Sequence, residues 1–205
     1  MTPITEQELH QIVEQVVRRT IGAAPASPAV PVASIPPAAP QSSVKTPPSA
    51  PAAMKTIAIG SDHGGYKMKE MLKSYLVELG YGVSDCGTAD GTTAVDYPDF
   101  ALAVALQVKE NKAWRGIVVD GAGIGSCMAA NKVPGVRAAL CYDYATAVNS
   151  REHNDANVLT LGAGLIGDNL AKQIVKTWLA TEFGGARHQK RIDKIITIET
   201  KFMKG

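Results

Sequence analysis

Short apolar runs alternate with longer, helix-patterned segments over most of the chain. The apolar runs are KTIAIG (55–60), YGVSDC (81–86), RGIVVDG (115–121), VRAALCY (136–142) and VLTLGAG (158–164). Apolar residues recur at helical spacing around 65–79, 98–111, 124–132, 143–150, 168–182 and 187–203. Continuous apolar strands that alternate with helices are typical of a parallel sheet covered on both faces. The pattern predicts an α/β domain over 54–205, a doubly wound, five-stranded parallel sheet in three α/β/α layers.

The pattern of residues 1–22 predicts a separate amphipathic helix. Thr5 and Glu8 have the spacing of a capping box, and Gly22 is a residue type that commonly follows a helix end. The apolar positions on one helical face are Leu9, Ile12, Val13, Val16, Val17 and Ile21. An isolated helix of this length is marginal in water, so its apolar stripe is expected to need a partner. The helix either folds back onto its own domain or docks on another protein.

A proline-rich segment, 23–53, separates this helix from the α/β domain. It contains nine of the twelve prolines and a single charged side chain, Lys45. Such a composition does not bury a core, and repeated proline favours an extended, polyproline-like spacer. The segment is therefore predicted to be a linker.

Charge and cysteine content narrow the class of protein. A net charge of +2 gives no general electrostatic reason to bind nucleic acid or a membrane surface. Cys86, Cys127 and Cys141 are an odd set without zinc-like spacing, which favours a reducing compartment. The sequence shows neither a secretory leader nor an apolar run of about 18 residues. The expectation is a soluble, cytoplasmic protein.

Polar chemistry follows the predicted strands at their carboxyl ends, where ligands of doubly wound sheets bind. Asp62 and His63 come after the first strand, and Asp120 comes directly before the glycine-rich stretch GAGIGS (121–126). Backbone N–H groups freed by these glycines could bind a phosphate or a developing oxyanion. Two alternatives stay open: a dinucleotide site, because Asp143 follows about 20 residues later, and a tight turn without a ligand.

Two further polar groups lie nearer the C-terminus. His153 and Asn154, in SREHNDAN, are expected in the loop after the fourth strand, at the same carboxyl edge. Arg187 and Arg191, in RHQKR, are expected on one helical face, where they could grip a phosphate. The alternatives are an ordinary surface or core histidine for His153 and a solvated basic face for the two arginines.

Five ordered motifs resemble one known family: SDHGGYKMKE, DYPDFA, GAGIGSCMAANKVPGVRAAL, REHNDANVLTLGA and RHQKRID. They are similar to ribose-5-phosphate isomerase B and its relatives, which include the galactose-6-phosphate isomerase subunits. The resemblance covers about residues 55–200. It implies a Rossmann-like domain that forms a homodimer, often a tetramer, with sites between subunits and without a metal or cofactor. The implied reaction interconverts aldose and ketose phosphates through a cis-enediol.

The resemblance also implies roles for individual residues. Asp62 and His63 would contact the sugar ring and the phosphate side of the pocket, and Tyr97 would help to line it. His153 would assist ring opening, Asn154 would hold a hydroxyl, and Arg187 and Arg191 would bind the phosphate. The anion hole for the enediolate oxygen would be formed by Gly121, Ala122, Gly123, Ile124, Gly125 and Ser126.

The sequence departs from the family pattern at four positions. Many members carry a cysteine base where this chain has Asp120, and others use a glutamate where it has Ser126. Ala122 replaces a usual threonine or serine, and Gly164 replaces a common arginine. Asp120 is thus the one side chain of this loop that could act as the base, unless it caps the following helix. An aspartate at this position also resembles one galactose-6-phosphate isomerase subunit.

The sequence as a whole predicts an isomerase of pentose or hexose phosphates, with ribose 5-phosphate and ribulose 5-phosphate as the first expected pair. A catalytically silent phosphosugar-binding or scaffold subunit is the alternative from another class. The extension 1–22 resembles the encapsulation peptides of bacterial microcompartments. That pattern implies a shell or cargo protein as partner, and a microcompartment as the location.

Overall fold

The computed structural model describes residues 5–21 and 54–203. The chain divides into two compact units, Met1–Pro48 and Ser49–Gly205. The predicted linker 23–53 and the predicted helix end at Gly22 lie outside the described residues. Among the helices of the described ranges, none is long and apolar enough to cross a membrane.

The described residues of the first unit form the helix α1 (Glu6–Ile21). Its start is a capping box: the Thr5 N–H donates to Glu8 Oε2 at 2.8 Å, and the Glu8 N–H donates to Thr5 Oγ1 at 3.4 Å. Hydrogen bonds from the Thr5 N–H and the Thr5 hydroxyl to Glu8 Oε2 lower the pKa of Glu8 below its ordinary value. The side chains of Ile12, Val13 and Val16 are exposed within this unit. The predicted helix and its capping box are confirmed.

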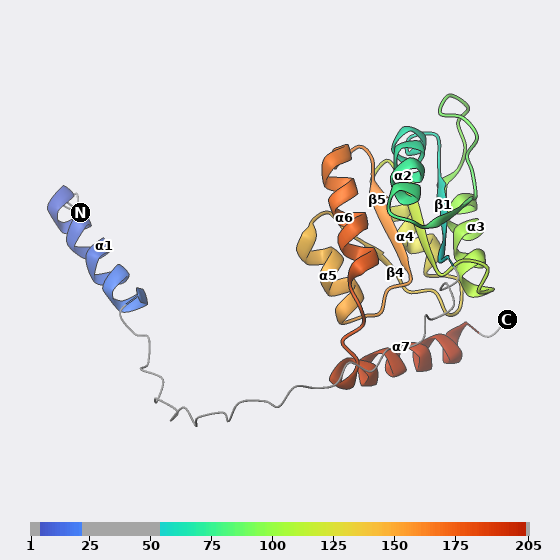
Figure 1. Ribbon diagram of the computed structural model, residues 1–205. Coiled ribbons are helices and arrows are strands. Elements are labelled where there is room, and N and C mark those ends of the chain that lie inside the picture. The colour runs from blue at the N-terminus through green and yellow to red at the C-terminus, as the bar shows by residue number, and fades with distance from the viewer. Residues whose placement is uncertain (1–4, 22–53, 204–205) are drawn as a thin grey trace, which may run out of the picture. The chain divides into compact units, whose positions relative to one another are not determined.

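The second unit is built on a five-stranded sheet in which every paired strand is parallel (Figure 1). The strands are β1 (Thr56–Ser61), β2 (Gly82–Asp85), β3 (Arg115–Asp120), β4 (Ala138–Leu140) and β5 (Val158–Gly162). Their order is β2-β1-β3-β5-β4, so the chain winds first to one side of β1 and then to the other. The predicted doubly wound parallel sheet is confirmed.

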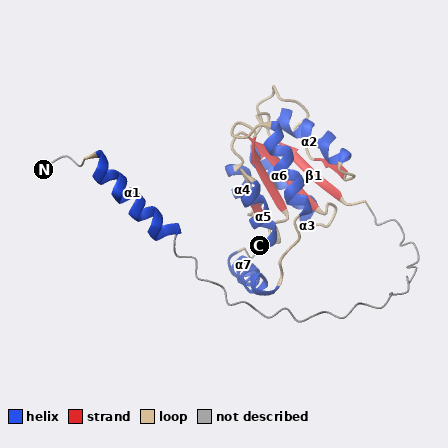
Figure 2. Ribbon diagram, turned by 60° about the vertical axis from the view of Figure 1, so that its left-hand side comes forward, coloured by secondary structure: helices blue, strands red, loops and turns tan. Residues whose placement is uncertain are grey.

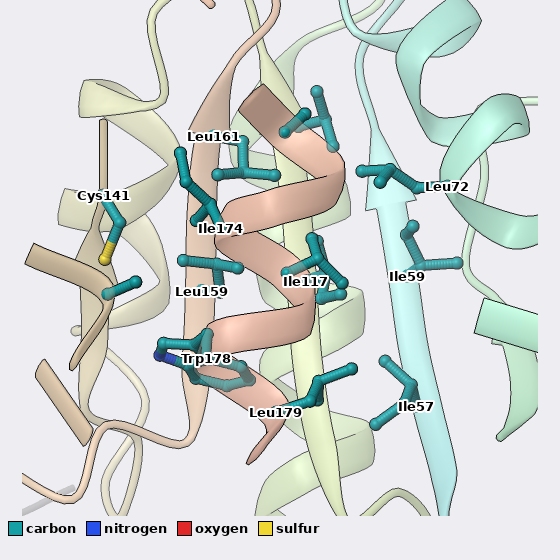
Figure 3. Packing of buried hydrophobic residues seen from close by; sticks show 14 of the residues in the cluster. Ile57, Ile59, Leu72, Ile117, Cys141, Leu159, Leu161, Ile174, Trp178 and Leu179 are labelled. Atoms are coloured by element: carbon teal, nitrogen blue, oxygen red, sulfur yellow. The ribbon is translucent and has the colours of Figure 1, made fainter. Parts of the chain in front are cut away.

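Helices cover both faces of the sheet (Figure 2). They are α2 (Tyr66–Glu78), α3 (Tyr97–Lys109), α4 (Ile124–Ala130), α5 (Tyr144–Glu152) and α6 (Asp168–Ala180). One apolar cluster joins the sheet to α2, α5 and α6, and Figure 3 shows Ile174 and Trp178 of α6 beside Ile117 and Leu159 of the strands. A second cluster joins the sheet to α3 and α4. Buried apolar side chains on both faces explain why the strands read as continuous apolar runs.

The sheet has a carboxyl edge, where β1, β3 and β5 end, and an amino edge, where they begin. Arg115, the first residue of β3, donates from Nη1 to the carbonyl oxygens of Trp178 at 2.9 Å and Leu179 at 3.1 Å. These bonds place the end of α6 at the amino edge. A short 3-10 helix, η1 (Ala186–His188), and the last helix, α7 (Gln189–Phe202), continue from there (Figure 1).

Candidate functional site

The carboxyl edge brings together Asp62, His63 and the glycine loop 121–126. Asp62 follows β1, is buried, and accepts a hydrogen bond at Oδ1 from the Gly65 N–H at 2.8 Å, at the start of α2. A Cβ built on Gly64 would lie 3.4 Å from Asp62 Oδ1 and 3.9 Å from the Gly121 N. The exposed His63 ring has Nδ1 3.2 Å from the backbone of Val95. Residues from the ends of β1 and β3 therefore line one region of this edge.

Asp120 is buried at the end of β3, and its carboxylate accepts four hydrogen bonds. Oδ1 accepts from the N–H groups of Ala122, at 2.8 Å, and Gly123. Oδ2 accepts from the Ser126 N–H at 3.1 Å and from the Ser126 hydroxyl. An ionised carboxylate offers about four acceptor sites, so these donors match its charged form. The structure thus shows the helix-capping role that the sequence left open beside the base role.

These bonds change the expected anion hole. The N–H groups of Ala122, Gly123 and Ser126 bind Asp120, so they are not available to a substrate oxygen. The remaining donors of the loop are the N–H groups of Gly121, Ile124 and Gly125, for which the described part of the chain supplies no acceptor. An oxyanion bound at this loop would accept hydrogen bonds from these three N–H groups.

Two tyrosines position the loop. Tyr97, the first residue of α3, lies against Gly125, where an added Cβ would come within 2.7 Å of the Tyr97 hydroxyl oxygen. Tyr97 was expected to help line the pocket, and this contact places it beside the glycine loop. Tyr142 was not singled out from the sequence. It donates its hydroxyl to the Ala122 carbonyl at 2.7 Å, and its place just after β4 was the one sequence signal that could have found it.

The glycine pattern has a local explanation as well. Gly123 has φ +76°, and a Cβ there would lie 2.8 Å from the carbonyl carbon of Leu161. Backbone conformation and close approach both require glycine at this position. Asp143, the acidic residue of the dinucleotide alternative, caps α5 by accepting from the Thr146 N–H at 2.7 Å. Its carboxylate is therefore committed to a helix start.

The expectation that His153 and Asn154 lie at the carboxyl edge is wrong. Both follow α5 and precede β5, so they lie at the amino edge with Glu152. The reason is that α5 runs antiparallel to the strands and carries the chain back across the sheet. The Gly184 N–H donates to the Glu152 carbonyl at 2.9 Å, which joins this corner to the segment after α6.

His188 also lies in this amino-edge group, although no role was predicted for it from the sequence. Its ring stacks on His153, with centroids 4.2 Å apart and planes 12° apart. Arg187 Nε donates to His188 Nε2 at 3.2 Å. Burial of the ring, together with the charges of His153 and Arg187, lowers the pKa of His188 below its ordinary value. Position within the quoted motif RHQKR was the one available signal.

The two arginines have a different setting from the one expected. Arg187 lies in η1 and α7 begins only at Gln189, so Arg187 and Arg191 do not share one α-helix. Both side chains are exposed, and in the described ranges neither forms an ion pair with a carboxylate. Two exposed cations near His153 remain suited to an anionic ligand.

Gly164, which replaces an arginine of the family pattern, contacts the loop through its backbone. Its N–H donates to the Gly121 carbonyl at 2.9 Å, and an added Cβ would lie 3.0 Å from that same oxygen. A larger residue would need a small shift of the loop. The substitution thus leaves the glycine loop closely packed against the end of β5.

Comparisons with known proteins agree on one family. The model of the ribose/galactose isomerase family matches residues 57–195. Ribose-5-phosphate isomerase B of Escherichia coli is 43% identical over 148 residues, 72% of this chain and 99% of the relative. D-erythrulose-4-phosphate isomerase of Pectobacterium atrosepticum is 41% identical over 142 residues, 69% of this chain and 93% of the relative. The solved structure of Clostridium thermocellum ribose-5-phosphate isomerase B is 52% identical, with a TM-score of 0.70 over 72% of this chain and 99% of that one.

Proposed function

This chain belongs to the ribose/galactose isomerase family and is a sugar phosphate isomerase of the aldose-ketose class, and we propose that it interconverts ribose 5-phosphate and ribulose 5-phosphate. The observation that carries the proposal is the convergence of Asp62, His63 and the loop after Asp120 at one sheet edge. A relative named for ribose 5-phosphate and a solved structure named for the same substrate support it.

The proposed site needs two copies of the chain. Asp62, His63 and Asp120 lie at the carboxyl edge, whereas His153 and Arg187 lie at the amino edge of the same sheet. A strand of five residues, such as β5, spans about 16 Å, which is longer than a pentose phosphate. One substrate molecule therefore does not reach both groups of one chain. In a homodimer, the amino-edge group of one copy completes the carboxyl-edge group of the other.

An exposed apolar surface on α3 and α4 supports such a dimer. It adjoins the glycine loop and consists of Leu102, Leu106, Ile124 and Met128, of which Met128 is 65% exposed. Apolar side chains grouped beside a polar site are typical of an interface between subunits. Burial of this surface against a second copy would also shield the reaction from water.

The reaction conserves all atoms and requires only proton movements. After the sugar ring opens, a base removes the proton from C2, the C–H electron pair forms the C1=C2 bond, and O1 gains negative charge. Protonation of O1, loss of the O2 proton to form the C2=O2 bond, and return of the abstracted proton to C1 give the ketose. We assign Asp120 as the base. The N–H groups of Gly121, Ile124 and Gly125 would stabilise the enediolate oxygen.

Other side chains would hold the substrate. Asp62 and His63 would bind sugar hydroxyls from the carboxyl edge, with Tyr97 closing one side. From the second copy, Asn154 would hold a hydroxyl and the two arginines would bind the phosphate. Asp120 must turn one oxygen from Ser126 toward the substrate, because four donors surround it in the described state.

Incubation with ribose 5-phosphate and detection of ribulose 5-phosphate tests the proposal. Galactose 6-phosphate and D-erythrulose 4-phosphate belong in the same assay, the second because a 41% identical relative is named for it. Greater kcat/KM for ribose 5-phosphate than for both is the expected result. A greater kcat/KM for one of the other two sugar phosphates would assign that compound as the substrate. Absence of turnover with all three would favour a catalytically silent binding subunit.

We also propose that α1 docks this enzyme onto a shell or cargo protein of a bacterial microcompartment. Support comes from its capping box and from the exposed apolar residues Ile12 and Val13. An amphipathic helix with one apolar face fits a hydrophobic groove on a partner. The proline-rich composition of 23–53 suits a spacer between such a helix and an enzyme.

A further inference from the structure

We propose that Asn149 is a positioning residue that fixes His153 in the tautomer with its proton on Nε2, so that His153 meets the substrate as a hydrogen-bond donor. Asn149 lies in the last turn of α5, one helical turn before His153, and its Nδ2 is 2.9 Å from His153 Nδ1. The catalytic part of this inference rests on the proposed function, whereas the tautomer itself does not.

A backbone carbonyl sets the direction of the hydrogen bonds. The carbonyl oxygen of Asn149 accepts and never donates, and Asn154 Nδ2 lies 3.3 Å from it. This end of the Asn154 amide must therefore be the NH2 group. The same NH2 group lies 3.3 Å from the Asn149 side-chain oxygen Oδ1, which can accept from it. The orientation of both amides follows from one obligate acceptor.

The tautomer of His153 follows in turn. Since Oδ1 of Asn149 accepts from Asn154, the other end of the Asn149 amide is NH2 and donates to His153 Nδ1. A ring nitrogen that accepts a hydrogen bond carries no proton, so the proton of the neutral ring is on Nε2. Glu152 Oε1 lies 4.0 Å from Nε2, which suits a nitrogen that carries a proton.

The groups packed against the ring favour the same state. His188 stacks on His153 from η1, and Arg187 Nε donates to His188 Nε2, so neutral His188 has its proton on Nδ1. Burial and the charges of His153, Arg187 and Arg191 disfavour protonated His188. A neutral ring stacks on His153 without charge repulsion. Glu152 is the one carboxylate near this pair in the described residues.

This arrangement limits what His153 can do. With Nδ1 engaged by Asn149, the ring presents Nε2–H to its surroundings, and it does not accept a proton there. It would donate a hydrogen bond to the ring oxygen of the sugar as negative charge develops during opening. The group that removes the proton from the sugar hydroxyl must then be another residue.

Nitrogen NMR of the full chain with 15N-labelled histidine tests the inference without any substrate. The His153 signals are identified by their loss in His153→Gln. In the parent protein we expect a protonated Nε2 and an unprotonated Nδ1. Asn149→Asp should move the proton to Nδ1, because a carboxylate accepts where the amide donates, and Asn149→Leu should give a mixture of tautomers. Asn169→Leu makes the same change on α6 and should leave the His153 signals unchanged.

Turnover provides the second measurement. Asn149→Asp should lower kcat by about 10²-fold, the usual effect of losing one oriented donor to a developing charge, with a changed pH profile. A parent ring protonated at Nδ1, or signals unaffected by Asn149→Asp, would overturn the inference. If the parent turns over no sugar phosphate, the proposed function fails while the NMR result still decides the tautomer.

Discussion

The buried carboxylate of Asp120 caps the start of α4 and, in the proposed reaction, receives a proton from the substrate. Both tasks use the same oxygens, since donors from Ala122, Gly123 and Ser126 already surround them. Substitutions at this position therefore affect folding and catalysis together. The two effects are separated by measuring stability and turnover on the same variants.

Asp120→Asn should lower kcat by about 10²- to 10⁴-fold with little change in KM, because the amide is not a base. It should also lower the free energy of unfolding by about 1–3 kcal/mol, since an amide NH2 would face buried donors. Steady-state kinetics and urea titration measure the two effects. Asp120→Cys, which introduces the commoner family residue, should retain measurable turnover. Isomerisation by Asp120→Asn at the parent rate would leave only the capping role.

His188 should make stability depend on pH. Its pKa is lowered in the folded chain by burial and by the neighbouring cations, so the unfolded chain takes up a proton first as the pH falls through about 6.5. The contribution of this ring is therefore complete above that pH and is lost below it. His188→Phe keeps a ring on His153 and should reduce the loss of stability between about pH 7.5 and pH 5.5. Urea titration measures the free energy of unfolding at both pH values. If His188→Phe loses as much stability as the parent between them, this account is contradicted.

At the scale of the elements, glycine begins both α2 and α6, but only one of these positions has a steric need for it. Gly65 and Gly167 are the N-cap residues of α2 and α6, with φ of −89° and −85°. A Cβ on Gly65 would collide with the carbonyl of Val119, lying 2.6 Å from its carbon, whereas nothing lies within 4 Å of a Cβ on Gly167.

Gly65→Ala should lower the free energy of unfolding by about 1–3 kcal/mol, the usual cost of an overpacked buried site. The helix start should also shift away from β3 and disturb the bond between Gly65 and Asp62. Gly167→Ala is the matched control and should change stability by less than about 0.5 kcal/mol. Equal effects of the two substitutions, measured by thermal or urea unfolding, would exclude the close approach as the cause.

The elements show what the sequence could predict. Strand positions followed from apolar runs, and the predicted helix at 143–150 lies close to the observed Tyr144–Glu152. The prediction of the carboxyl edge for His153 was wrong because the nine-residue helix α5 advances by about 13 Å and returns the chain across the sheet. Residue types left the role of Asp120 open between base and helix cap, since its bonds to the glycine loop depend on backbone directions that the sequence does not specify.

At the scale of the whole molecule, the isomerase domain should function independently of the extension 1–53. The family model matches residues 57–195, and 148 aligned residues cover 99% of the Escherichia coli relative, so removal of 1–53 leaves the family span intact. Deletion of 1–53 should leave kcat, KM and oligomeric state unchanged, as measured by assay and size-exclusion chromatography. Loss of dimerisation or folding would place the extension in the core.

Docking through α1 should depend on its apolar face. Ile12→Glu should abolish co-assembly of the full chain with microcompartment shell protein, because a charge would be buried in the groove. Gln11→Glu adds the same charge on the neighbouring residue and should retain co-assembly. Equal binding of the parent chain and both variants to the shell would contradict the docking proposal.

Complementation between two defective chains tests the central claim, that sugar phosphate is isomerised at a site completed by a second copy. One chain carries Asp120→Asn, and the other carries Arg187→Ala with Arg191→Ala; both are co-expressed with different tags. Each alone should convert ribose 5-phosphate poorly. Random pairing places one intact site in each mixed dimer, so the co-expressed preparation should regain about a quarter of the parent kcat/KM. Activity no greater than the sum of the separate variants would contradict a site shared between copies.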